Sequence, residues 1–204
     1  MRADRLQLSK THFDSEAADY DKSRKYAWVR ATYPFVVEES LRYQFQTFLD
    51  VGCGTGALLS RISEQRKDVQ LFGIDLSEQM IKVARAKLGD KAELRVSDSE
   101  QLPFEDSKFD LITCTYSFHH YPNPSAVLTE MKRVLSSAGK LILVDPWIPT
   151  PIRQIFNLLS PLRKEGVFYS KREMHSFVNS VGLEITKWLV HWHGYLMVAE
   201  KRSE

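Results

Sequence analysis

Short apolar runs alternate with helical patterns along most of the chain, from Phe48 onward. Alternation of this kind is typical of βαβ units, which assemble into a parallel sheet with helices on its faces. Each apolar run is short enough to be a strand buried on both faces. The runs are 47–51, 70–74, 92–96, 109–115 and 139–144. The sequence therefore predicts an α/β, doubly wound fold.

Start and stop signals place helices between these runs. Ser77 is a predicted N-cap and Gly89 is the predicted stop of one helix. After Pro124, apolar residues recur with the helical period, as expected of a helix that packs on the sheet. Two further apolar runs, 184–190 and 194–199, are separated by a short turn. They predict a terminal β-hairpin that closes the sheet.

The composition fits one globular domain and argues against several classes of partner. The chain has 204 residues, of which 43% are hydrophobic and 26% charged, enough for a core of its own. Its 28 basic and 26 acidic side chains leave a net charge of +2. Nothing in this balance indicates binding to nucleic acid or to an anionic membrane. We therefore expect small-molecule chemistry.

Cysteine usage and the N-terminal residues indicate a cytoplasmic protein. Cys53 and Cys114 form no C-x-x-C pair, so neither a disulfide framework nor a zinc site is expected. The N-terminal segment is charged, and no run approaches the roughly 20 apolar residues that a membrane helix needs. We expect a soluble, unsecreted protein.

Three alternating glycines follow the first predicted strand. The segment reads Phe48-Leu49-Asp50-Val51-Gly52-Cys53-Gly54-Thr55-Gly56. A glycine has no Cβ and adopts positive φ readily, so the backbone can turn sharply and a ligand can lie against its N–H groups. The segment predicts a nucleotide-type ligand site at the end of this strand.

The carboxylate of Asp50 bears on which ligand binds. It would repel the pyrophosphate of a dinucleotide at close range. S-adenosylmethionine instead carries an ammonium and a carboxylate on its methionine end, and an acid beside bare backbone N–H groups complements both. However, Gly52, Gly54 and Ala57 also satisfy the looser G-x-G-x-x-G/A pattern of Rossmann dehydrogenases. The loop alone leaves both ligands open.

Two further acids end the next two predicted strands. Asp75 ends the second strand, where a carboxylate can accept hydrogen bonds from both hydroxyls of a ribose. Asp98 lies just past the third strand and can accept a hydrogen bond from an adenine amino group. The alternatives are an acid at a helix N-terminus for Asp75 and a solvated loop acid for Asp98. Together with Asp50, the two acids favour S-adenosylmethionine.

The stretch from Phe48 to Asp145 resembles the class I S-adenosylmethionine-dependent methyltransferases, especially the methyltransferase type 11 domain group, which includes ubiquinone and menaquinone biosynthesis enzymes. The matching segments are 49–56, 73–77, 98–104, 109–112 and 118–120. The resemblance implies a Rossmann-like, seven-stranded, mostly parallel sheet with an antiparallel last strand. The chain departs from the family at 136–139, where Ser-Ser-Ala-Gly replaces the usual Lys-Pro-Gly-Gly.

The resemblance also implies which residues bind the cofactor. Thr115, Tyr116 and Phe118, just after the fourth strand, would lie along the methionine and sulfonium part. Aromatic faces stabilise such a weakly hydrated cation by about 1 kcal/mol each. An N-terminal helix would fold over the cofactor and place Tyr20 near the methyl group; the alternative for Tyr20 is ordinary packing. The predicted cofactor site is Asp50, Gly52, Cys53, Gly54, Gly56, Asp75, Leu76, Met80, Asp98, Ser99, Thr115, Tyr116 and Phe118.

Residues at the acceptor end could include a base. In-line methyl transfer needs one only if the acceptor must first lose a proton. The catalytic candidates are His119, His120 and Tyr20. Adjacent positions point different ways, so we expect at most one of the two histidines to face the acceptor. Either histidine could instead be structural, bonded to the backbone or to water.

A proline-rich stretch, 146–170, contains a predicted helix with an apolar face at Ile152, Ile155, Phe156 and Leu159. It could be a lid over a lipophilic acceptor, or an ordinary crossover packed on the core. Downstream, His191 and His193 share a face of the hairpin, but no third ligand accompanies them, so no metal is predicted.

We therefore expect an enzyme that transfers a methyl group from S-adenosyl-L-methionine to a small-molecule acceptor, leaving S-adenosyl-L-homocysteine. One domain is expected, with an N-terminal helical cap (1–45), a cofactor-binding core (46–145), a substrate lid (146–170) and a C-terminal helix and β-hairpin (171–204). The alternatives are a cofactor-binding regulator without turnover and an NAD-dependent oxidoreductase. The sequence names neither the acceptor nor the oligomeric state.

Overall fold

The computed structural model describes residues 2–163, 166–191 and 194–202. Its strands are β1 (Thr47–Val51), β2 (Gln70–Asp75), β3 (Ala92–Val96), β4 (Phe109–Thr115), β5 (Leu135–Asp145), β6 (Leu183–His191) and β7 (Gly194–Lys201). Its α-helices are α1 (Arg2–Glu16), α2 (Ala27–Ser40), α3 (Ala57–Gln65), α4 (Glu78–Leu88), α5 (Pro124–Val134), α6 (Ile152–Arg163) and α7 (Lys171–Ser180). Three short 3-10 turns are η1 (Arg24–Tyr26), η2 (Gly89–Lys91) and η3 (Phe118–His120).

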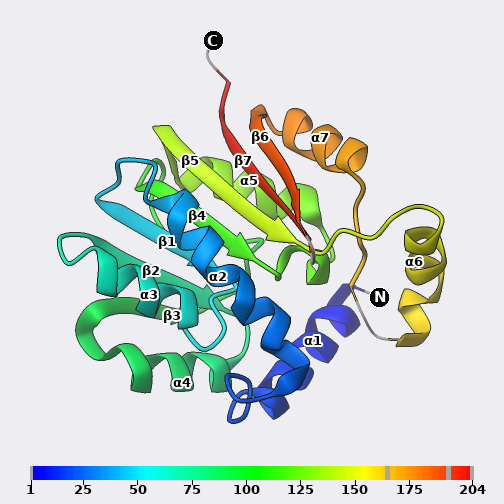
Figure 1. Cartoon of the computed structure of the whole chain (residues 1–204), viewed down its shortest axis with the longest axis horizontal. Coiled ribbons are helices and arrows are strands. Elements are labelled where there is room, and N and C mark those ends of the chain that lie inside the picture. The colour runs from blue at the N-terminus through cyan, green and yellow to red at the C-terminus, as the bar shows by residue number, and fades with distance from the viewer. Residues whose placement is uncertain (1, 164–165, 192–193, 203–204) are drawn as a thin grey trace.

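The strands form one twisted sheet in the order β3-β2-β1-β4-β5-β7-β6 (Figure 1). Strands β1 to β5 pair in parallel, whereas β7 runs antiparallel to both β5 and β6. The predicted doubly wound, seven-stranded sheet with an antiparallel last strand is confirmed. The strand order reverses at β1, and ligands of open α/β sheets bind outside the carboxyl ends of strands at such a switch point.

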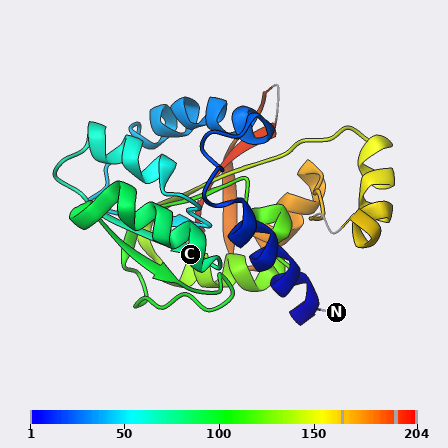
Figure 2. The same ribbon diagram turned by 90° about the horizontal axis from the view of Figure 1, so that it is seen from below.

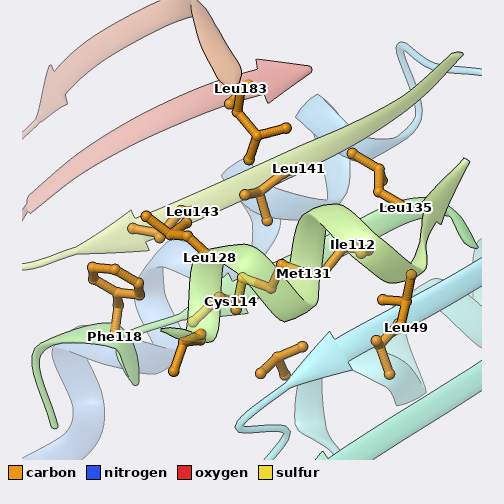
Figure 3. Packing of buried hydrophobic residues seen from close by; sticks show 14 of the residues in the cluster. Leu49, Ile112, Cys114, Phe118, Leu128, Met131, Leu135, Leu141, Leu143 and Leu183 are labelled. Atoms are coloured by element: carbon orange, nitrogen blue, oxygen red, sulfur yellow. The ribbon is translucent and has the colours of Figure 1, made fainter. Parts of the chain in front are cut away.

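Two apolar layers, one on each face of the sheet, form the core. Leu49 and Ile112 belong to the layer that α5 and α7 cover, which Figure 3 shows from close by. Phe48 and Leu111, their neighbours in sequence, belong to the opposite layer under α2, α3 and α4. Successive side chains of a strand point to opposite faces, so a strand between two helical layers is apolar at every position.

The predicted strand limits agree with the observed ones to within two residues, with one exception. Ser77 caps α4 by accepting a hydrogen bond from the N–H of Met80, at 3.1 Å, and Gly89 ends that helix. Strand β5, however, begins at Leu135, four residues before the predicted 139. Leu135 has extended φ and ψ of −72° and 136° and is fully buried. Leu135 continues the helical period of the apolar residues after Pro124, so the sequence pattern did not distinguish the end of α5 from the start of a strand.

Helix α6 projects from the body of the molecule (Figures 1 and 2). The predicted helix is present, but Ile152, Ile155 and Leu159 of its predicted apolar face are 50%, 56% and 39% exposed. Phe156 instead contacts Phe168 across a ring-to-ring distance of 6.3 Å. None of the helices in the described part of the chain has the length and apolar character to cross a membrane.

Candidate functional site

A cavity lies at the carboxyl ends of the central strands, under α1. Its walls come from α1, the glycine loop after β1, the ends of β2 and β3, and the turn after β4. Twelve of the residues that the sequence predicts for the site line it: Tyr20, Gly52, Cys53, Gly54, Asp75, Leu76, Met80, Asp98, Ser99, Thr115, Tyr116 and His120. Asp50, Gly56, Phe118 and His119 lie outside the lining.

The backbone N–H groups of the glycine loop are already hydrogen-bonded within the protein. Those of Gly52 and Cys53 both donate to the carbonyl oxygen of Ile74 at 2.9 Å, and that of Gly54 donates to Asp75 Oδ2 at 2.8 Å. The expectation that these groups are bare is therefore wrong for this loop. The space beside Gly54 is open, because a Cβ added there would have no heavy atom within 4 Å. A ligand can therefore approach the backbone of Gly54 closely.

Asp75, at the end of β2, is hydrogen-bonded to the glycine loop that follows β1. Besides the bond from Gly54, its Oδ1 accepts a hydrogen bond from the N–H of Ser77 at 2.8 Å. Burial raises the pKa of this carboxyl, and the backbone donors act in the opposite direction. Each carboxylate oxygen can accept about two hydrogen bonds, so both retain a lone pair for ligand hydroxyls.

Asp50 lies beneath the loop instead of in the cavity. It shares a sheet face with Phe48, because side chains alternate along β1, and it is 3% exposed. Thr113 lies directly opposite in β4 and donates its hydroxyl to Asp50 Oδ1 at 2.8 Å. Burial is the main cause that raises the Asp50 pKa to about 7.

The turn after β4 holds two unusual features. Tyr116 has φ of +52°, in the left-handed region that residues with a Cβ rarely occupy. Thr115 Oγ1 is buried and has no hydrogen-bond partner among the described residues, although Thr115 lines the cavity. Strain and an unpaired buried hydroxyl are costly and concentrate at functional sites. Both observations fit a ligand at this position.

Phe118 and the two histidines follow in η3 and point in different directions. Phe118 is fully buried in the core, where it contacts Tyr121 and Tyr169, so it does not reach the cavity. His120 lines the cavity and meets the ring of Phe13 edge-on at 5.2 Å. Burial holds the pKa of His120 well below its usual range, so its ring is neutral near pH 7.

Helix α1 is attached to the cavity rim by a contact that the sequence did not indicate. Asp14 Oδ1 accepts a hydrogen bond from Ser77 Oγ at 2.6 Å, and Asp14 forms an ion pair with Lys10 at 3.1 Å. A second attachment joins Asp21 to Lys87 of α4 at 2.6 Å. The contacts of Asp14 with Ser77 and of Asp21 with Lys87 join residues more than 60 positions apart, and local patterns carry no signal for them.

Other lining residues were also missed, and no metal centre emerges. Tyr33, Ser117 and Tyr121 line the cavity without any motif that marks them. Among the described residues, no group of three or more histidine, cysteine, aspartate or glutamate side chains could hold a metal ion. His193, one of the two hairpin histidines considered above, lies outside the described residues.

Comparison with known sequences identifies the domain. Residues 49–143 match a family model described as a methyltransferase domain. The demethylmenaquinone methyltransferase of Deinococcus radiodurans is 33% identical over 132 residues, which cover 63% of this chain and 52% of that protein. The chain thus spans about half the length of this relative. The ubiquinone/menaquinone biosynthesis C-methyltransferase UbiE of Paraburkholderia phytofirmans is 27% identical over 179 residues, 75% of this chain and 74% of that protein.

Solved structures share the fold. The YcgJ protein of Bacillus subtilis has a TM-score of 0.69 and 26% identity, over 79% of this chain and 71% of that one. A putative methyltransferase solved in complex with the Trm112 methyltransferase activator of Haloferax volcanii has a TM-score of 0.78 at 18% identity, over 94% and 98% of the two chains. Residues 49–143 are therefore similar to a methyltransferase domain, and the chain shares the fold of solved methyltransferases.

Proposed function

We propose that the protein methylates a small, planar, hydroxylated acceptor of the quinol or phenol type, with S-adenosylmethionine as methyl donor. The observation that carries the proposal is the end of the cavity beyond β4, where the neutral ring of His120 lies among aromatic side chains. The aromatic residues of the cavity lining are Phe13, Tyr20, Tyr33, Tyr116 and Tyr121, and the ring of Phe13 contacts that of His120. The two relatives compared above are named for menaquinone and ubiquinone biosynthesis, which supports an acceptor of this class.

The residues present fit the donor. Asp75 would bind the ribose, Asp98 and Ser99 the adenine, and the unpaired hydroxyl of Thr115 a polar group of the methionine part. The aromatic lining suits a sulfonium cation. A protein with the same fold, the 1,6-didemethyltoxoflavin-N1-methyltransferase of Burkholderia thailandensis, has been solved with S-adenosylhomocysteine bound, at a TM-score of 0.76 and 13% identity. When bound, S-adenosylmethionine supplies an electrophilic methyl group.

The chain's own residues would select and activate the acceptor. The charged lining residues from the described part of the chain are Lys10, Asp75 and Asp98, which lie on α1 and at the ends of β2 and β3. The region after β4 thus favours an uncharged acceptor. A hydroxyl proton would pass to a ring nitrogen of His120, since a neutral imidazole can act as a base. We also propose that residues 1–45 cap the cavity, supported by the bonds of Asp14 and Asp21.

A comparison of matched acceptors tests this function. Release of S-adenosylhomocysteine is measured without oxygen, first with a quinol and then with the corresponding quinone, which lacks the hydroxyl protons. We expect turnover with the quinol and with phenols, and none with the quinone. Faster turnover of amines or carboxylic acids than of any phenol or quinol would contradict the proposed acceptor class.

Replacement of Asp75 tests the cofactor assignment separately. We expect Asp75→Ala to weaken binding of S-adenosylhomocysteine by about 1–3 kcal/mol, because the ribose hydroxyls and two backbone N–H groups lose their acceptor. Titration calorimetry measures the affinity. Asp68→Ala is the matched control, since Asp68 is an exposed acid near the opposite end of β2 that pairs with Arg66. Equal affinities of the Asp75 and Asp68 variants would rule out the ribose role.

A further inference from the structure

Asp145, which neither the motifs nor the cavity lining includes, is the most deeply buried acid near the site. It ends β5, pairs with Tyr195 of β7, and is 1% exposed. Its Oδ1 shares a hydrogen bond of 2.7 Å with Nδ1 of His119, which is also buried. Burial raises the pKa of the Asp145 carboxyl, and one proton lies between the two groups whichever of them carries it.

His119 is fixed on several sides besides this bond. Its carbonyl oxygen accepts a hydrogen bond from the N–H of Val167 at 2.8 Å, and Phe168 stacks on its ring at 5.3 Å. Gly166 packs so closely that a Cβ there would lie 2.1 Å from the His119 carbonyl oxygen. Asp145 therefore holds Nδ1 of a ring whose backbone and one face are already fixed.

The ring of His119 in turn contacts that of His120. The two ring centres are 4.0 Å apart, and Phe13 of α1 meets His120 from another side. The His120 N–H donates to the carbonyl oxygen of Ser117 at 3.0 Å, which fixes its backbone. A chain of contacts thus runs from Asp145 through His119 to a ring that lines the cavity.

We propose that Asp145 is a positioning residue: its carboxyl group fixes the ring of His119, which holds the ring of His120 in place at the acceptor. This inference rests on the proposed function, in which His120 takes the hydroxyl proton and later releases it to water. The charged or titratable groups that act on His120 are His119 of η3 and His12 and Arg5 of α1, and all three lower its pKa further. Displacement of His119 would change this environment.

Two substitutions of Asp145 distinguish the effect of its hydrogen bond to His119 from the effect of its packing in β5. Asp145→Val keeps a branched side chain of similar size in β5 but removes the hydrogen bond, whereas Asp145→Asn keeps an acceptor oxygen for His119. For the Val variant, we expect kcat to fall at least tenfold with S-adenosylhomocysteine affinity within twofold of the unchanged protein. The Asn variant should retain most of kcat. An equal loss of kcat in both variants would contradict a role that depends on the hydrogen bond.

A magnetic resonance titration of the His120 ring in the cofactor-free protein tests whether Asp145 positions this ring. The titration needs no acceptor, so its result does not depend on the proposed acceptor class. We expect the Val variant to shift the His120 ring signals and titration midpoint, and Asp110→Asn, at the far end of β4, to leave them unchanged. His119→Phe removes the same bond while keeping an aromatic ring, and serves if the Val variant does not fold. Unchanged His120 signals in a folded Val or Phe variant would overturn the proposal.

Discussion

Gly52→Ala is expected to destabilise the protein by about 2–5 kcal/mol and to abolish cofactor binding. Gly52 has φ of +76°, which costs a residue with a Cβ roughly 1–2 kcal/mol. The added Cβ would also lie 2.1 Å from Ser117 Oγ and 2.9 Å from Tyr121 Oη, and such overpacking costs about 1–3 kcal/mol more. Urea denaturation and calorimetry with S-adenosylhomocysteine measure the two effects.

Gly54→Ala is the matched control for this substitution. Gly54 also has positive φ, +53°, but a Cβ there would have no heavy atom within 4 Å. It should therefore show only the backbone part of the destabilisation, about 1–2 kcal/mol. Two variants with the same loss of stability would show that backbone strain, and not contact with the turn after β4, is what requires glycine at position 52.

The sequence predicts the sheet well because each strand carries its own evidence. Phe48, Leu49 and Val51 of this segment are apolar and lie on both sides of the strand, which is expected only where helices cover both sheet faces. The start of α4 is predictable for the same reason, because Ser77 and the N–H that it caps are three positions apart. The antiparallel last strand, by contrast, is what the family resemblance implies.

Placement within the site depends on contacts that local patterns do not contain. The same alternation that predicts β1 also decides that Asp50 and Val51 face opposite layers, but the sequence does not say which face borders the cavity. Likewise, the helix over 152–163 is predictable from its period, whereas the period does not show that Ile155 faces solvent. Asp145 was missed because its partner His119 is 26 positions away on another element.

Asp50→Asn is expected to make the protein more stable at pH 8 and to remove a pH dependence of stability. The Asp50 pKa is about 7 in the folded protein, against 3.8 ordinarily, because the carboxyl is buried. Between these two pH values the folded state holds a proton that the unfolded state has lost. The free energy of unfolding therefore falls as pH rises from about 4 to 7, by up to about 1.4 kcal/mol per pH unit, and is level above that range.

Asparagine has nearly the same shape as aspartate and carries no charge. The free energy of unfolding of the variant should therefore not fall between pH 4 and 7 on account of this position. The asparagine Oδ1 can still accept the hydrogen bond from Thr113. The expected gain at pH 8 is about 4 kcal/mol, and little gain is expected at pH 4. Urea denaturation of both proteins from pH 4 to 8 measures it; parallel curves would mean that Asp50 titrates normally. Since Asp50 lies outside the cavity lining, affinity for S-adenosylhomocysteine should change less than tenfold, and a larger loss would mean that Asp50 binds the ammonium group after all.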